Sequence, residues 1–234
     1  MIQAGQAKSV SDDKELLPLN VLLHCRTVVE KTNFVTTGVM THVEGELFEI
    51  ELNEFEVFEL GETVKLTVYS PAGIQTIQSI VFAKYEGAIA LLQPPNLQKR
   101  FKERREHPRI EIAGNAQVYH ALDESGEEVR LVQPLELTVF DISLSGLGIS
   151  GPDAPQIHRN MRLKAKVEIG FGFECELEII RREKQEDKVL LGAKMHMLEP
   201  EMMRPLRAMI LRRQVEKHAE LRKTTMASKR FGKS

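Results

Sequence analysis

The feature that most constrains the fold is a regular alternation of apolar and polar residues in short segments. In FECELEI, residues 173–179, Phe173, Cys175, Leu177 and Ile179 alternate with glutamates. Successive side chains of a β-strand point to opposite faces, so this pattern indicates a strand with one face in a core and the other in water. Turn residues separate the segments of this kind, which are 46–52, 63–68, 110–120, 135–143, 161–169, 173–179 and 189–198. Short strands at this spacing predict closed or nearly closed β-barrels.

Two such blocks follow each other along the chain. Pro94 and Pro95 end the first block, because proline does not continue the interior of a strand, and a polar, basic stretch follows them. We expect a mainly β protein: two small antiparallel β-barrels in tandem, the first of which could also be a sandwich, and a C-terminal amphipathic helix after the second. The expected domains are a mobile N-terminus (1–15), a first barrel (16–97), a basic hinge (98–109), a second barrel with its helix (110–215) and a basic tail (216–234).

After the last predicted strand, the apolar residues recur with the period of a helix. Met202, Leu206, Met209 and Ile210 follow this spacing from Glu199 onward, with arginines between them. We expect this face to pack on the second barrel, and a partner-binding groove is the alternative. The closing stretch KTTMASKRFGKS has the composition of a disordered basic tail.

Charge is unevenly distributed along a chain whose net charge is −2. Residues 98–109 hold six Lys or Arg against two Glu, whereas residues 1–97 hold six Lys or Arg against 13 Asp or Glu. This segregation favours a local anion site over a protein that coats nucleic acid. The absence of Trp and the 6% aromatic content also argue against nucleic acid as a partner.

Several function classes lack their sequence signatures. No apolar run approaches the ~20 residues of a membrane helix and the first residues do not resemble a signal peptide, so we expect a cytoplasmic protein without a transmembrane segment. Cys25 and Cys175 form no CxxC motif and are expected to be buried thiols. Phosphate-loop, metalloprotease, nucleophile-elbow and dinucleotide motifs are missing, so we expect no enzyme, no catalytic residue, no metal site and no cofactor.

Two stretches carry side chains suited to binding a guanine nucleotide: three arginines before a predicted strand, and an Asp, a Ser and a Gly in a later turn. They are Arg104, Arg105, Arg109, Asp141, Ser143 and Gly146. Arginine binds phosphate with two parallel hydrogen bonds, donates to the O6/N7 edge of guanine and stacks on a base. A carboxylate accepts from the N–H groups on guanine's other edge, a Ser adds a hydroxyl, and a Gly lets a ligand approach the backbone.

Each stretch alone has a plainer interpretation. Basic residues before a domain often form a solvated linker. A DxSxxG sequence is often a tight turn in which Asp and Ser bond to nearby backbone groups. The combination, with a strand after the first stretch and a turn at the second, favours a binding site.

The two stretches resemble the paired signatures of the PilZ domain, RRxxxR and [D/N]xSxxG, in the same order. The resemblance covers residues 99–215, including the late strand with Gly192 and the helix after it. Residues 195–197 carry methionines where the family often has an aromatic residue, a difference that concerns packing. The resemblance implies a six-stranded β-barrel that binds cyclic di-GMP.

The resemblance also implies a role for each residue. Arg105 and Arg109 would grip the phosphates and guanine edges of the ligand. Asp141 and Ser143 would hydrogen-bond a guanine, and Gly146 would keep the turn open. The preceding Arg is similar to that of family members that take an intercalated ligand dimer, in which a further Arg stacks on a base; here this residue is Arg104.

An acidic barrel followed by a PilZ domain resembles the YcgR-type flagellar brake architecture. This resemblance implies a protein partner such as a flagellar motor or stator component, and recruitment to the flagellar basal body. Our hypothesis is that cyclic di-GMP orders the basic hinge, residues 98–109, and changes the orientation of the two barrels. The alternatives are an effector for polysaccharide export, a PilZ-type protein-interaction adaptor that binds no nucleotide, a nucleic-acid binder and, last, an enzyme.

Overall fold

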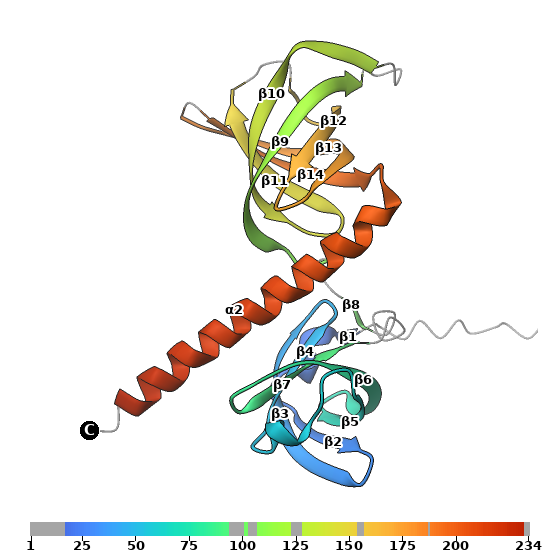
Figure 1. Cartoon of the computed structure of the whole chain (residues 1–234), viewed down its shortest axis with the longest axis vertical. Helices are drawn as coiled ribbons and strands as arrows, with labels where there is room; N and C mark the ends of the chain where they lie inside the picture. The colour runs from blue at the N-terminus through green and yellow to red at the C-terminus, as the bar shows by residue number, and fades with distance from the viewer. Residues whose placement is uncertain are drawn as a thin grey trace, which may run out of the picture. The chain divides into compact units, whose positions relative to one another are not determined.

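The computed structural model describes residues 17–93, 101–102, 107–122, 128–153, 157–186 and 188–231. The chain divides into two units, Met1–Arg104 and Arg105–Ser234. Each unit contains one closed barrel of six strands (Figure 1). The expectation of two antiparallel β-barrels in tandem is confirmed. No helix in these described ranges combines the length and the apolar character that a membrane crossing requires.

The barrel of the first unit has the strand order β2-β3-β4-β7-β6-β5. Its strands are β2 (Arg26–Lys31), β3 (Phe34–Glu44), β4 (Leu47–Glu51), β5 (Thr63–Ser70), β6 (Gly73–Tyr85) and β7 (Ala88–Leu92). The short 3-10 helix η1 (Leu19–Leu22) precedes β2, and a second one, η2 (Phe55–Val57), lies between β4 and β5 in the sequence. The short strand β1 (Leu17–Pro18) pairs in parallel with β8 (Phe101–Lys102). Phe48, Ile50 and Leu66 belong to its buried core.

The barrel of the second unit has the strand order β10-β11-β14-β13-β12-β9. Its strands are β9 (Ile110–Leu122), β10 (Glu128–Ile142), β11 (Gly146–Pro152), β12 (Arg162–Glu168), β13 (Gly172–Gln185) and β14 (Lys188–Met197). The alternation expected in β13 is present, because Phe173, Cys175, Leu177 and Ile179 are all buried. Burial of the Cys175 thiol raises its pKa to about 12.

One strand of this barrel, β11, has no counterpart among the segments that alternation identifies. Its sequence GLGISGP has glycines at positions that the alternation would assign to outward polar side chains. Close packing explains one of them, since a Cβ at Gly148 would lie 2.7 Å from the ring of Phe140. Hydrophobic periodicity therefore gives no signal for β11.

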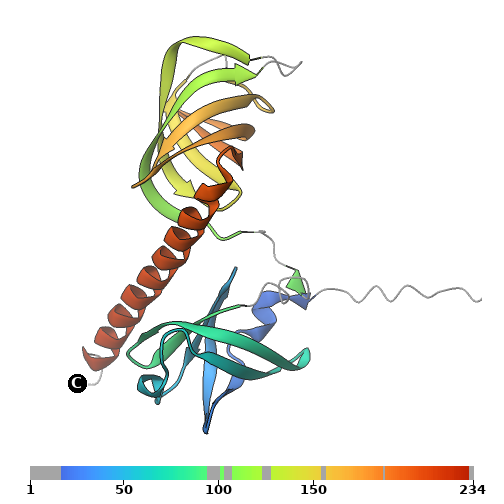
Figure 2. The same ribbon diagram turned by 45° about the vertical axis from the view of Figure 1, so that its right-hand side comes forward.

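The C-terminal helix, α2 (Met203–Phe231), follows a short 3-10 helix, η3 (Pro200–Met202). It starts at one end of the second barrel and continues away from that end (Figures 1 and 2). Leu206 and Ile210 belong to the buried core of this barrel, and Met209 packs against it. The expected barrel-packing face is confirmed.

The helix is longer than expected. Its backbone continues through residues 216–231, so the expectation of a disordered tail is wrong for residues 223–231. No Gly or Pro interrupts the sequence between Pro205 and Gly232, and most residues of the segment are good helix formers. Glu216 also forms ion pairs with Arg212, at 2.8 Å, and Arg213, at 3.4 Å, one helical turn earlier.

Candidate functional site

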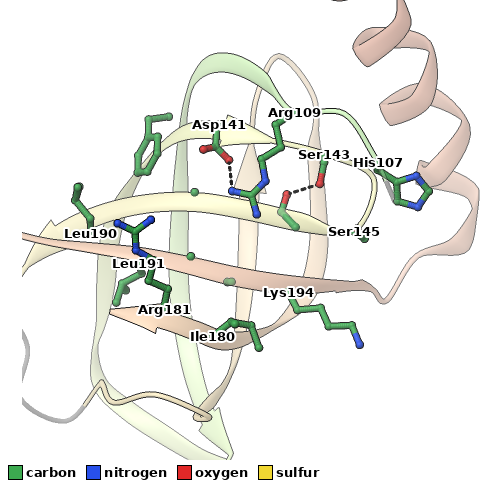
Figure 3. A pocket seen from close by; sticks show the side chains of 15 residues that line it. His107, Arg109, Asp141, Ser143, Ser145, Ile180, Arg181, Leu190, Leu191 and Lys194 are labelled. Atoms are coloured by element: carbon green, nitrogen blue, oxygen red, sulfur yellow. Dashed lines mark hydrogen bonds and ion pairs between the residues drawn. The ribbon is translucent and has the colours of Figure 1, made fainter. Parts of the chain in front are cut away.

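A cavity of about 590 Å³ opens on the outer face of the second barrel, over β10, β11, β13 and β14 (Figure 3). Four of the residues identified from the sequence line it: Arg109, Asp141, Ser143 and Gly146. Arg109 comes from the segment that enters β9. Asp141 lies near the end of β10, Ser143 lies in the turn after it, and Gly146 begins β11. The structure therefore brings the two sequence stretches together. Arg104 and Arg105 lie outside the described residues.

Arg109 and Asp141 form an ion pair across the cavity rim. The guanidinium Nη1 lies 3.3 Å from the Oδ1 of Asp141, and the two side chains are 39% and 22% exposed. The remaining N–H groups of Arg109 and the second carboxylate oxygen offer donors and acceptors side by side. Such a pair suits a ligand that presents both acceptors and donors, as the two edges of guanine do.

Ser143 and Gly146 form a tight turn beneath this pair. The Ser143 backbone N–H donates to the Gly146 carbonyl oxygen at 2.9 Å, and the Ser143 hydroxyl donates to the same oxygen at 3.4 Å. Ser143 is only 3% exposed, so its hydroxyl supports the turn in this structure. A Cβ at Gly146 would lie 3.0 Å from the Ala193 carbonyl oxygen, so the absence of a side chain allows the turn to pack against β14.

Gly148 is a site residue that the sequence reasoning missed. It lies opposite Asp141 in the pairing of β10 with β11. A Cβ at Gly148 would lie 2.7 Å from the Asp141 carboxylate and 2.7 Å from the ring of Phe140. The missing side chain therefore lets the Asp141 carboxylate lie over β11. The available signal was the spacing of Gly146 and Gly148, which places both on one face of a strand.

The opposite side of the cavity carries further residues that the sequence reasoning did not identify. Ile180 and Arg181 come from β13, and Gly192 and Lys194 come from β14. Figure 3 shows the Arg181 side chain extending from β13 across β14 towards Leu190, while Asp141 lies on the other side of β11. The cavity thus has arginines on two sides, and this favours an anionic ligand.

The family model of the PilZ domain matches residues 103–212. Curated protein sequences give no match.

Among solved structures, YcgR from Escherichia coli in complex with c-di-GMP is 16% identical, with a TM-score of 0.40, and the match covers 91% of this chain and 98% of that chain. The Bacillus subtilis inhibitor of motility, MotI/DgrA, is 15% identical, with a TM-score of 0.38 and coverages of 83% and 98%. The K. pneumonia MrkH–c-di-GMP complex is 12% identical, with a TM-score of 0.40 and coverages of 86% and 92%.

The family match spans the second barrel and the first turns of α2. It includes both sequence signatures and the cavity that they line. Residues 103–212 are therefore a PilZ domain, and another six-stranded barrel precedes this domain in the chain.

Proposed function

We propose that this protein is a receptor for cyclic di-GMP that controls a partner protein. The observation that supports the proposal most strongly is the ion pair between Arg109 and Asp141 at a glycine-lined cavity in a PilZ domain. The ligand carries two phosphates and two guanines. Arg109 donates to a phosphate or to a guanine O6/N7 edge, while Asp141 accepts from the guanine N–H groups.

The ion pair prepares these two groups for the ligand. Both side chains are partly exposed, and pairs of this kind contribute roughly 0–1 kcal/mol to stability. The ligand therefore replaces the pair at a small cost. Meanwhile the pair holds both side chains at the cavity and reduces the ordering that binding requires.

The arginines that precede the second barrel also contact the ligand. Arg105 joins Arg109 on the phosphates and guanine edges, and Arg104 stacks on a base of a second, intercalated ligand molecule. A ligand with two negative charges offsets half of the net charge of residues 98–109, which is 6 − 2 = +4, and two intercalated ligand molecules offset all of it. We infer that this neutralisation orders the hinge and changes the orientation of the two barrels, which then meet the partner.

The test of the receptor is calorimetric titration of the full chain with cyclic di-GMP. Wild-type protein should bind, and Arg109→Ala should bind roughly ten- to hundredfold more weakly, because a hydrogen bond to a charged group contributes about 1.5–3 kcal/mol. Arg162→Ala is a matched control: Arg162 is an exposed arginine of the same barrel, paired with Glu176 at 3.2 Å, and it does not line the cavity. Folded wild-type protein that gives no binding heat would overturn the receptor and favour the nucleotide-independent adaptor.

For the partner, we propose a component of the flagellar motor, so that the protein acts as a motility brake. The deletion strain of the host bacterium should swim faster than wild type when cyclic di-GMP is high, and wild-type protein but not the Arg105→Ala, Arg109→Ala double variant should restore slow swimming. Unchanged swimming together with altered exopolysaccharide would assign the protein to polysaccharide export instead.

A further inference from the structure

Two β-bulges flank the cavity. One interrupts β10 between Val139 and Asp141, and the other interrupts β13 between Ile179 and Arg181. A bulge adds one residue to a strand and so reverses the face on which the following residues lie. These two bulges lie on either side of the paired strands β11 and β14.

Each bulge turns one charged residue outward. In β13 the inward residues run Cys175, Leu177 and Ile179, so strict alternation would direct Arg181 into the core. The extra residue at Ile180 leaves both Ile180 and Arg181 on the surface. The bulge in β10 does the same for Asp141, which would otherwise follow Val139 on the inward face.

The two outward residues lie in one row across four strands. Asp141 is opposite Gly148, Gly148 is opposite Gly192, and Gly192 is opposite Arg181. Three strand spacings of about 4.8 Å give this row a length of at most roughly 14 Å between the two backbone ends. We call the two central residues, Gly148 and Gly192, the glycine floor. It carries no side chain between the charged ends of the row.

Packing does not require the second glycine of this floor. A Cβ at Gly192 would meet only the Cβ of Arg181, at 3.4 Å, which is an ordinary contact. Its φ is also outside the left-handed range that favours glycine. The missing side chain at Gly192 therefore has its main effect on the cavity, where it leaves a flat surface beside Arg181.

The bulges also place apolar side chains beside the glycine floor. Phe140 and Ile180 are the added residues, both are exposed, and both line the cavity. A flat floor with apolar groups beside it suits a planar base. The charged groups at its ends then meet the polar edges of the ligand.

From these observations we propose that Arg181 is a second ligand-binding residue, which contacts the half of cyclic di-GMP farther from Asp141. The inference rests on the proposed function of the site. The guanidinium donates a pair of hydrogen bonds to acceptor atoms of that half, either the O6/N7 edge of its guanine or its phosphate oxygens. The PilZ signatures do not include this position.

Arg181 forms an ion pair with Glu183. The two side chains are 75% and 44% exposed, so the pair is weak and readily exchanged for the ligand. Glu183 therefore competes with the ligand for the guanidinium. Removing the carboxylate charge frees Arg181 and should leave the affinity for cyclic di-GMP unchanged or slightly higher.

The test is calorimetric titration of the full chain with cyclic di-GMP for wild type, Arg181→Ala and Arg182→Ala. Arg182 is the neighbouring arginine, is ion-paired with Asp153 and does not line the cavity, so it is the matched control. Arg181→Ala should raise Kd at least about tenfold, and Arg182→Ala should raise it less than about twofold. Arg181→Lys should recover only part of the affinity, because an ammonium cannot form the paired bonds. Thermal melts of each variant check that the fold is retained.

The outcomes separate this inference from the proposed function. Binding that Arg109→Ala weakens and Arg181→Ala leaves intact would overturn the role of Arg181 and keep the receptor. Full recovery by Arg181→Lys would overturn the paired contact. Titrations at several ionic strengths identify the bound group: loss of the Arg181 charge should reduce the salt dependence of binding more strongly if the contact is a phosphate than if it is a guanine edge, because the guanine edge lies farther from the ligand's charges.

Discussion

The two barrels have the same topology, and comparing them shows which features make a site. Both follow the order first-second-third-sixth-fifth-fourth strand, and both have bulges at matching places. The bulges of β3 (between Met40 and His42) and β6 (between Val81 and Ala83) correspond to those of β10 and β13. The bulges are therefore a property of this barrel topology and do not by themselves create a binding site.

The residues in the corresponding rows differ. In the first barrel the row runs His42, Glu49, Ala90 and Ala83, where the second barrel has Asp141, Gly148, Gly192 and Arg181. The Glu49 carboxylate covers the central part of the row and accepts hydrogen bonds from the Thr41 hydroxyl at 2.6 Å and the Tyr85 hydroxyl at 2.5 Å. The central positions of the row carry side chains in the first barrel and none in the second, where the Asp141 carboxylate and the Phe140 ring approach Gly148 instead.

The largest expected effect comes from deleting a core side chain of one barrel, which tests whether the two barrels unfold independently. Phe48→Ala and Phe173→Ala each delete a fully buried ring, and each should lower the free energy of unfolding of its own barrel by about 3–5 kcal/mol. Urea unfolding followed by hydrogen exchange of each unit measures this. Equal destabilisation of both units by either variant would show that they unfold as one.

Converting the floor of the second barrel into that of the first should abolish the site. Gly148→Glu introduces the residue of the first barrel, with a side chain that displaces the Asp141 carboxylate and adds negative charge. We expect cyclic di-GMP affinity to fall at least about a hundredfold, or roughly 2.7 kcal/mol, in calorimetric titrations. Gly61→Ala, at a turn of the first barrel where φ is +82°, strains the backbone away from the cavity and should leave the affinity unchanged, so it controls for a loss of stability. Binding by Gly148→Glu at wild-type strength would contradict the role of the floor.

Each barrel contains one cysteine, and alkaline pH should distinguish them. Burial raises the pKa of Cys175 from 9.0 to about 12. Burial also raises the pKa of Cys25. The folded state keeps the Cys175 proton, while the unfolded chain releases it above pH 9, so the stability of the second barrel should fall as pH rises from 9 towards 12. At pH 10 the loss is about 1.4 kcal/mol. Unfolding experiments on wild type and Cys175→Ala measure it, and identical pH profiles would contradict it.

The smallest expected effect concerns exposed ion pairs. Arg109→Ala removes the pair with Asp141, and Lys65→Ala removes the pair with Glu30, 2.6 Å long, in the first barrel. Each variant should change the free energy of unfolding by less than about 1 kcal/mol. Thermal melts test this. A larger loss for Arg109→Ala would mean that the arginine supports the fold as well as the ligand.

Sequence patterns predicted the architecture well where burial is one-sided. The alternation in β13 and the helical spacing of Leu206 and Ile210 both result from contact with one core, so they are visible in the sequence. The pattern fails at β11, where glycines replace the polar residues that complete an alternation. It also fails beyond residue 215, where α2 continues without an apolar periodicity that identifies it.

The candidate site was predictable in part for a similar reason. Arg109, Asp141, Ser143 and Gly146 stand in two recognisable stretches, and the structure brings them to one cavity. Arg181 has no such signal, because it stands beside Arg182 and only the pairing of β13 with β14 decides which of the two faces the cavity. Bulges arise from strand pairing across the barrel, so their positions cannot be predicted from the local sequence.

The position of Arg109 next to Ile110 has a mechanical consequence. Ile110 belongs to the same buried cluster as Leu206 and Ile210, at the base of α2. The helix has 29 residues and, at about 1.5 Å per residue, is roughly 43 Å long. A rotation of about 5° at its base would move its far end by roughly 4 Å. A rotation of a few degrees at the base of the helix would therefore move its far end by nearly the spacing between neighbouring strands, which is about 4.8 Å.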